Sequence, residues 1–455
     1  MITLKDNNKE KQESQLVMTN KPLLLLQAPV TTLSGYGARS RDIALALIQS
    51  DKYDVKIWPT RWGMTPTNAL DKDNPKHKLI MERVLTSPQL QAQPDIYIQI
   101  TVPNEFQRIG KYNIGITAGI ETTIASGPWI EGCNRMDLVL TSSEHSKKVL
   151  SESVWQKQNS ETHQPEGEVK LTTPIEVLFE GVDLDTYMKL DSTVTAVETL
   201  KELKQIKEDF CFLYVGHWLQ GDFGEDRKNT GLLIRTFLET FKNKTSKNKP
   251  ALILKTSSAD FSPIDREDIL KKIRSIYKAT PGNNLPNVYL LHGDLTDEEM
   301  NMLYNHPKVK AHVSLTKGEG YGRPFAEASL SQKPVIVPNW SGHLDFMKHA
   351  VLLPGTMTNV HHSVAIPDMI LQESQWFSVD TGYTMGIMKH IFENYKDYQI
   401  NAKKQATLIR KEFNFDNMKE KLILIMDAKV PEFPKQVEIK LPTLKKIELP
   451  KLQKL

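Results

Sequence analysis

Short apolar runs alternate along this chain with stretches of helical periodicity. Residues 22–27 contain four consecutive leucines, a pattern typical of a strand buried on both faces of a parallel sheet. Residues 37–48 follow with apolar side chains on one stripe, which predicts a helix that packs on that strand. Further strands of this sheet are expected at 53–58, 95–100, 113–116 and 138–141, and the alternation resumes with strands expected at 212–216, 251–255, 311–315 and 335–337.

Two such halves predict two domains, and 455 residues are enough for each domain to bury a core of its own. The segments between and around them are polar or charged. The expected division is a polar N-terminal extension at 1–20, a first Rossmann-like domain at 21–190, an interdomain linker at 191–209, a second Rossmann-like domain at 210–380, C-terminal helices at 381–428 and a basic, proline-containing tail at 429–455.

The amino-acid composition excludes several classes of protein. With 58 Lys and Arg against 55 Asp and Glu, the net charge of +3 argues against a protein held to nucleic acid mainly by charge. Cys133 and Cys211 are too few for a disulfide framework and lack metal-ligand spacing. We therefore expect a reducing compartment, the cytoplasm. Neither a signal peptide nor an apolar run long enough to span a membrane is evident, so a soluble protein is expected.

The candidate chemistry lies in residues 317–328, Lys-Gly-Glu-Gly-Tyr-Gly-Arg-Pro-Phe-Ala-Glu-Ala. The strand expected at 311–315 should deliver Glu319 to the carboxyl edge of a sheet, where ligands of open α/β folds bind. Gly318, Gly320 and Gly322 allow positive φ angles and should let backbone amides approach a ligand with no Cβ atom in the way. Pro324 suits the first turn of a helix, so a helix should begin near Arg323 with its positive end facing the same place.

A bound anion is expected at this turn, with a diphosphate as the obvious candidate. Glu319 and Glu327 would accept hydrogen bonds from hydroxyl groups beside it, which suits a polyhydroxylated ligand that carries phosphate. Arg227 and Lys228 precede another expected helix, where a cation is electrostatically unfavourable unless an anion binds to it.

These residues resemble the signature of retaining glycosyltransferases of the GT-B fold, family 4, also called glycosyl transferases group 1. Glu319 and Glu327 are separated by seven residues, as in that signature. The resemblance extends through residues 212–216 with Arg227 and Lys228, through 287–293, and in the first half through 112–115, Glu121, Trp129 and 176–183.

The resemblance implies an α/β GT-B fold, with two Rossmann-like domains whose parallel sheets face across a cleft and with C-terminal helices that return to the first domain. It implies transfer of a sugar from a nucleoside diphosphate sugar, bound by the second domain, to a hydroxyl acceptor bound by the first. Retention of configuration is also implied. No metal is expected, because the helix dipole and basic side chains would supply the charge, and no cofactor is expected beyond the nucleotide-sugar co-substrate.

The site residues follow from the same resemblance. Catalytic roles are expected for Glu319 and Lys228. Donor contacts are expected for Glu327, Gly320, Tyr321, Gly322, Arg323, Arg227 and His217, the last in place of an arginine that the family commonly has after the preceding glycine. Candidates on the acceptor side or in its loops are Gly35, Gly37, Glu121 and His343.

Alternatives remain open. Gly35 and Gly37 suggest a dinucleotide fingerprint, but Ser40 stands where the third glycine belongs, which disfavours a nicotinamide enzyme. A sugar-nucleotide epimerase or hydrolase on the same architecture would keep the donor site. The acceptor is a carbohydrate, a lipid-linked molecule or another hydroxyl compound. Modified DNA is a further alternative, because the tail 429–455 carries seven lysines against three glutamates.

Overall fold

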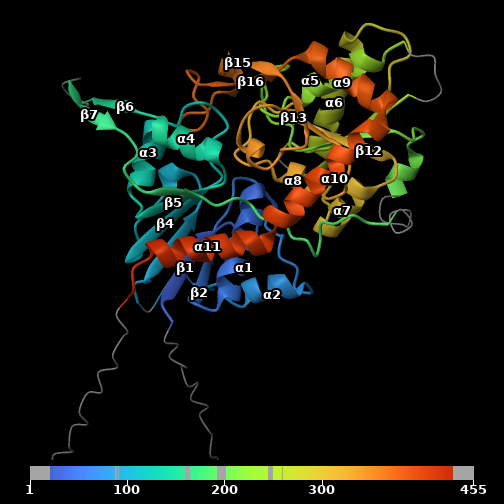
Figure 1. Cartoon of the computed structure of the whole chain (residues 1–455). Coiled ribbons are helices and arrows are strands. Elements are labelled where there is room, and N and C mark those ends of the chain that lie inside the picture. Colours follow the sequence, from blue (N-terminus) through green and yellow to red (C-terminus); the bar gives the residue numbers. More distant parts are fainter. Residues whose placement is uncertain are drawn as a thin grey trace, which may run out of the picture.

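The computed structural model describes residues 21–87, 90, 92–158, 164–191, 201–243, 249–258 and 260–433. The expected N-terminal extension at 1–20 lies outside these residues, as do most of the tail at 429–455 and residues 192–200 of the linker expected at 191–209. Figure 1 shows two α/β domains side by side, each built around its own sheet.

The first sheet has six parallel strands in the order β2-β1-β3-β4-β5-β8. Its strands are β1 (Leu23–Ala28), β2 (Asp54–Pro59), β3 (Ile96–Ile100), β4 (Tyr112–Thr117), β5 (Leu138–Thr141) and β8 (Ile175–Val177). Most residues of these strands are apolar and buried because helices cover both faces, whereas the edge strand β2 contains the partly buried Asp54 and Lys56. One face carries α1 (Gly35–Ser50) and α11 (Phe415–Lys429), with α2 (Pro75–Met81) beside α1, and the other carries α3 (Gly127–Asn134) and α4 (Glu144–Glu152).

The second sheet repeats this plan in the order β11-β10-β9-β12-β13-β14, again with all strands parallel. Its strands are β9 (Cys211–Val215), β10 (Ala251–Lys255), β11 (Val288–Leu291), β12 (Val309–Val313), β13 (Val335–Pro338) and β14 (Val351–Leu353). One face packs against α5 (Thr230–Phe241) and α6 (Pro263–Ala279), and the other against α7 (Asp297–Asn305) and α8 (Arg323–Ser329). The expected α/β fold with two Rossmann-like domains is confirmed.

The C-terminal helices divide between the domains. Met388 of α9 (Thr381–Glu393) and Ile409 of α10 (Tyr395–Glu412) are buried in the core of the second domain. The chain then crosses over, and α11 lies across the first domain (Figure 1). All of 381–428 was expected on the first domain; in the structure only the last of these three helices packs there, because its own apolar stripe matches that core.

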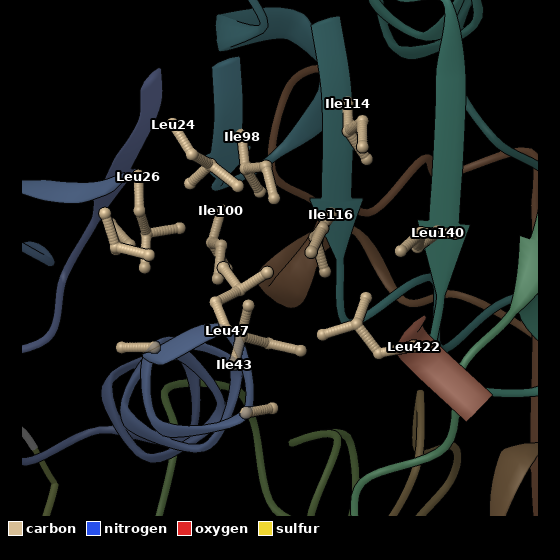
Figure 2. Close-up of a cluster of buried hydrophobic side chains, with 14 of the residues drawn as sticks. Leu24, Leu26, Ile43, Leu47, Ile98, Ile100, Ile114, Ile116, Leu140 and Leu422 are labelled. Atoms are coloured by element: carbon tan, nitrogen blue, oxygen red, sulfur yellow. The ribbon is translucent and has the colours of Figure 1, made fainter. Parts of the chain in front are cut away.

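Backbone hydrogen bonds hold this crossover in place. The N–H of Val182 donates to the carbonyl of Phe413 (2.9 Å), and the N–H of Phe415 donates to the carbonyl of Val182 (2.9 Å). Figure 2 shows Leu422 of α11 in the same buried cluster as Ile43 and Leu47 of α1. The last helix is thus part of the first domain's core.

Two hairpins complete the fold. The first joins β6 (Trp155–Gln158) to β7 (Pro165–Val169). Trp155 anchors it, since its indole N–H donates to the carbonyl of Ala125 (2.8 Å). The second joins β15 (Gly355–Asn359) to β16 (Gln375–Val379). No helix in the described part of the chain combines the length and apolarity needed to cross a bilayer.

Truncation of Leu422 tests the role of α11 in the first domain. Its side chain is fully buried, so Leu422→Ala should lower the free energy of unfolding by about 2–5 kcal/mol, measured by denaturant titration. Leu424 on the same helix is 62% exposed, and Leu424→Ala should change stability by less than about 0.5 kcal/mol. Equal effects of the two substitutions would contradict the packing described.

Candidate functional site

The second sheet reverses its strand order at β9, which lies between β10 and β12. Loops leaving adjacent strands at such a point diverge and leave room for a ligand at their carboxyl ends. The loop after β9 delivers Arg227 and Lys228, and the loop after β12 delivers Glu319. The two loops are tied together: the N–H of Lys317 donates to the carbonyl of Arg227 (2.7 Å), and the Arg227 guanidinium donates to the carbonyl of Gly318 (2.9 Å).

These three side chains form one charged cluster. Lys228 Nζ lies 2.5 Å from Glu319 Oε1, and Arg227 Nη1 lies 3.4 Å from Glu319 Oε2. Arg227 Nη2 also lies 3.5 Å from a carboxylate oxygen of Glu121, which follows β4 in the first domain. The predicted catalytic pair and two further predicted residues are therefore brought together, from both domains.

The electrostatics of Glu319 follow from this cluster. Burial alone would raise the pKa of its carboxyl, but the adjacent Lys228 and Arg227 outweigh burial and lower the pKa to about 2. Glu319 is therefore ionised at neutral pH. Burial lowers the pKa of Lys228, and its contact with Glu319 opposes that shift.

The turn after Glu319 leads into a helix that begins at Arg323, as the sequence predicts. Gly322 has a φ of 97° and precedes α8, which begins at Arg323 with a proline in its first turn. Gly318 and Gly320 do not adopt positive φ. A Cβ atom on Gly318 would lie 2.0 Å from the carbonyl oxygen of Glu121, and one on Gly320 would lie 2.3 Å from that of Ala118. These two glycines allow the domains to touch backbone to backbone.

Glu327 lies in a different set of contacts. Arg323 Nε donates to its Oε1 (3.0 Å), and the hydroxyl of Tyr304 donates to its Oε2 (3.3 Å). Burial raises the pKa of Glu327 to about 7, although Arg323 acts in the opposite direction. Arg323 also lies 2.5 Å from a carboxylate oxygen of Asp42 on α1 and 4.0 Å from one of Glu180. The expected donor contact Arg323 thus also links the two domains.

Two of the predicted site residues, Tyr321 and His343, are buried within the second domain. Tyr321 packs its ring against Phe346 (centroids 4.6 Å apart) within the core of the second domain. His343 is fully buried, with Nε2 2.8 Å from the carbonyl oxygen of Pro338 and its ring against Phe325. The acceptor-side role expected for His343 stays a prediction.

The remaining candidates lie after β9 and at the start of α1. His217 is exposed after β9, with Nδ1 3.3 Å from the hydroxyl of Ser257. Gly35 and Gly37 form the first turn of α1. A Cβ atom on Gly37 would lie 2.1 Å from the carbonyl oxygen of Thr32, whereas one on Gly35 would meet nothing within 4 Å. Gly37 is therefore required for a tight turn, and Gly35 leaves open space.

Sequence reasoning missed the partners of these residues in the first domain. Asp42 and Glu180, which lie near Arg323, are far from it in the sequence and gave no local signal. Tyr36 was also missed: its hydroxyl contacts that of Thr117 (3.0 Å) and accepts the N–H of Ala118 (3.1 Å). Its position between two glycines was the available hint. No group of three or more potential metal ligands is clustered within the described ranges.

Comparison with solved structures identifies the fold. No protein-family model matches the chain, and neither does any curated protein. Solved structures do match. A glycosyltransferase from Rickettsia africae aligns with a TM-score of 0.59 and 12% identity, over 90% of this chain and 99% of that one. HepE from Anabaena, in complex with UDP and glucose, aligns with a TM-score of 0.57 and 11% identity, over 90% of this chain and 100% of that one.

Sucrose-phosphate synthase from Thermosynechococcus elongatus aligns with a TM-score of 0.58 and 12% identity, over 90% of this chain and 98% of that one. Because the likeness extends over both domains, the architecture is the two-domain, Rossmann-like GT-B fold. At this level of identity the likeness establishes the fold alone.

The pKa of Glu327 generates a test of its environment. At pH values between about 4.5, the ordinary value for the unfolded chain, and about 7, the folded protein holds a proton that the unfolded chain has released. Stability should therefore fall as pH rises through this range, by up to about 1.4 kcal/mol per pH unit. Glu327→Gln should remove this part of the slope, measured by urea denaturation at several pH values.

Glu319→Gln is the matched control. Because the folded pKa of Glu319 is about 2, its carboxylate contributes stability above about pH 4.5, and that contribution is lost as pH falls toward 2. This variant should leave the slope between pH 5 and 7 unchanged. If Glu327→Gln also left that slope unchanged, the environment assigned to Glu327 would be wrong.

Proposed function

We propose that this protein is a glycosyltransferase that moves a sugar from a nucleoside diphosphate sugar to an acceptor hydroxyl. The observation that carries the proposal is the convergence of Lys228, Arg227 and Glu319 at the strand-order switch of the second sheet. Two cations suit a diphosphate, and a carboxylate beside them suits the sugar attached to it.

The donor would bind with its diphosphate at Lys228, Arg227 and the backbone of 320–322. The Lys228 ammonium has three N–H donors, so it can hold Glu319 and a phosphate oxygen together. Glu327 would accept hydrogen bonds from the ribose hydroxyls. HepE of Anabaena in complex with UDP-glucose, a structure of the same fold, supports a nucleotide-sugar donor.

The reaction breaks the bond between the anomeric carbon and the diphosphate oxygen and forms a bond from that carbon to the acceptor oxygen. The acceptor's proton passes to the leaving diphosphate, which completes the balance. We propose attack from the face that the leaving group vacates, with retention of configuration, as the resemblance at Glu319 and Glu327 implies. Glu319 would face the sugar ring, where positive charge develops.

Catalysis would come from charges fixed before the reaction begins. As negative charge grows on the diphosphate, Lys228 and Arg227 stabilise the transition state more than the ground state. We propose that these two side chains supply the charge that a divalent metal supplies elsewhere. Activity should then persist in a chelator such as EDTA.

The acceptor would enter from the first domain. Both glutamates are almost fully buried where the domains meet, so donor entry requires the domains to separate and reaction requires them to close, which excludes water. An α,α-trehalose-phosphate synthase of the same fold from Burkholderia xenovorans is in complex with glucose-6-phosphate, which supports a carbohydrate acceptor. The buried free thiols of Cys133 and Cys211 fit a cytoplasmic location.

A panel of nucleotide sugars tests the donor. The true donor at 100 times its dissociation constant should stabilise the fold by about 2.7 kcal/mol, seen as a thermal shift. With an acceptor present, free nucleoside diphosphate and a glycosylated product should form in equal amounts. Release of free sugar, or of an epimer, without any glycosylated acceptor would contradict transfer.

Glu319→Gln tests the catalytic carboxylate. We expect kcat to fall by roughly 100-fold, because the developing positive charge loses its partner. Donor affinity should stay the same or rise, since Lys228 is then shared with no carboxylate. Turnover equal to that of the wild type would remove Glu319 from the mechanism.

Lys228→Ala tests the charge on the diphosphate. This variant should lose roughly 100-fold or more in kcat/KM for the donor. Lys271→Ala is the matched control, because Lys271 has a 71% exposed side chain on α6 and pairs with Asp268 (3.0 Å). Kinetics unchanged in Lys228→Ala, or reduced equally in both variants, would contradict the assignment.

A further inference from the structure

Two stacked aromatic rings lie at the carboxyl edge of the first sheet. The ring of Tyr36, in the first turn of α1, and that of Trp62, in the connection from β2 to α2, have centroids 3.9 Å apart and planes 20° from parallel. Neither ring belongs to the charged cluster described above.

The connection that carries Trp62 is held firmly against the loop before α1. The N–H of Leu33 donates to the carbonyl of Pro66 (2.9 Å), and the N–H of Ala69 donates to that of Thr31 (3.0 Å). A turn hydrogen bond from the N–H of Thr65 to the carbonyl of Trp62 (3.1 Å) closes the tip. Trp62 is therefore positioned by backbone on both sides, as a binding platform requires.

A short series of contacts connects these rings to the loop after β12 that carries Glu319. The Tyr36 hydroxyl accepts the N–H of Ala118 (3.1 Å). The carbonyl of Ala118 lies against Gly320, where a Cβ atom would come within 2.3 Å. Gly320 directly follows Glu319, so the stacked pair stands beside the place where the acceptor must reach the sugar.

The stacked pair also retains open surface. Trp62 and Tyr36 are only partly buried, Met64 beside them is 87% exposed, and Gly35 is exposed with open space at its Cβ position. An indole fixed at the edge of solvent suits a flat ring with an apolar face, which it contacts by dispersion over a wide area. A pyranose ring has such a face of C–H groups and carries the hydroxyl that the reaction needs.

We propose that Trp62, supported by Tyr36, is a subsite on which the acceptor's sugar ring stacks, and that the acceptor is a glycoside. This inference rests on the proposed glycosyl transfer and names its acceptor class. A hydroxymethylated pyrimidine nucleoside shares the flat-ring chemistry, and the experiment separates the two sources.

Kinetics of three variants test the subsite. With UDP-glucose, or the donor found in the panel, Trp62→Ala should raise KM for alkyl and oligomeric glucosides about tenfold. Trp62→Phe, which keeps an aromatic face, should restore most of that loss. Met64→Ala is the control from the same loop and should behave as the wild type. The donor's dissociation constant, from thermal shift, should be the same in all variants.

The outcomes separate the two proposals. If no nucleotide sugar stabilises the wild type, the proposed function fails. If the donor binds and transfer occurs but Trp62→Ala leaves acceptor KM unchanged, the subsite alone is wrong. A rise in KM confined to hydroxymethylated nucleosides would overturn the glycoside assignment, and equal losses in Trp62→Ala and Met64→Ala would overturn the stacking role.

Discussion

The ion pair between Lys228 and Glu319 is the interaction on which the rest of the site depends. A buried charge is costly unless it is fully paired, and here each partner arrives on a different loop of the second sheet. Arg227 also pairs with the Glu319 carboxylate, and its other terminal nitrogen pairs with Glu121 of the first domain. The Arg227 side chain that would bind a diphosphate therefore also contacts the first domain. Under the proposed function, ligand binding and domain closure would involve the same ion pairs.

Contact between the domains imposes a second constraint, at backbone level. Gly318 and Gly320 lie so close to the carbonyls of Glu121 and Ala118 that no side chain fits between them. At one side of this contact, Arg323 reaches Asp42 on α1 while also holding Glu327. Arg323 therefore contacts both Glu327 and the first domain, so under the proposed function the position of Glu327 would depend on how the domains meet.

The sequence predicted those parts of the fold that depend on neighbouring residues. The apolar runs gave the buried strands, and Gly322 with Pro324 gave the start of α8. Contacts between distant segments could not be predicted in this way. The packing of α11 in the first domain's core, the ion pair of Asp42 with Arg323 and the stacking of Trp62 on Tyr36 have no local sequence signature. The buried positions of the Tyr321 and His343 rings, against Phe346 and Phe325, had no local signature either.

The two glutamates of the motif differ in charge state because their surroundings differ. Glu319 lies between two cations that outweigh burial, so its pKa is about 2 and it stays ionised. Glu327 has the single cation Arg323, which Asp42 and Glu180 also share, so burial prevails and the pKa is about 7. A permanently ionised carboxylate suits a developing cation, whereas one near neutrality suits hydrogen bonding to hydroxyl groups. The charge states that the surroundings produce therefore match the different roles proposed for Glu319 and Glu327.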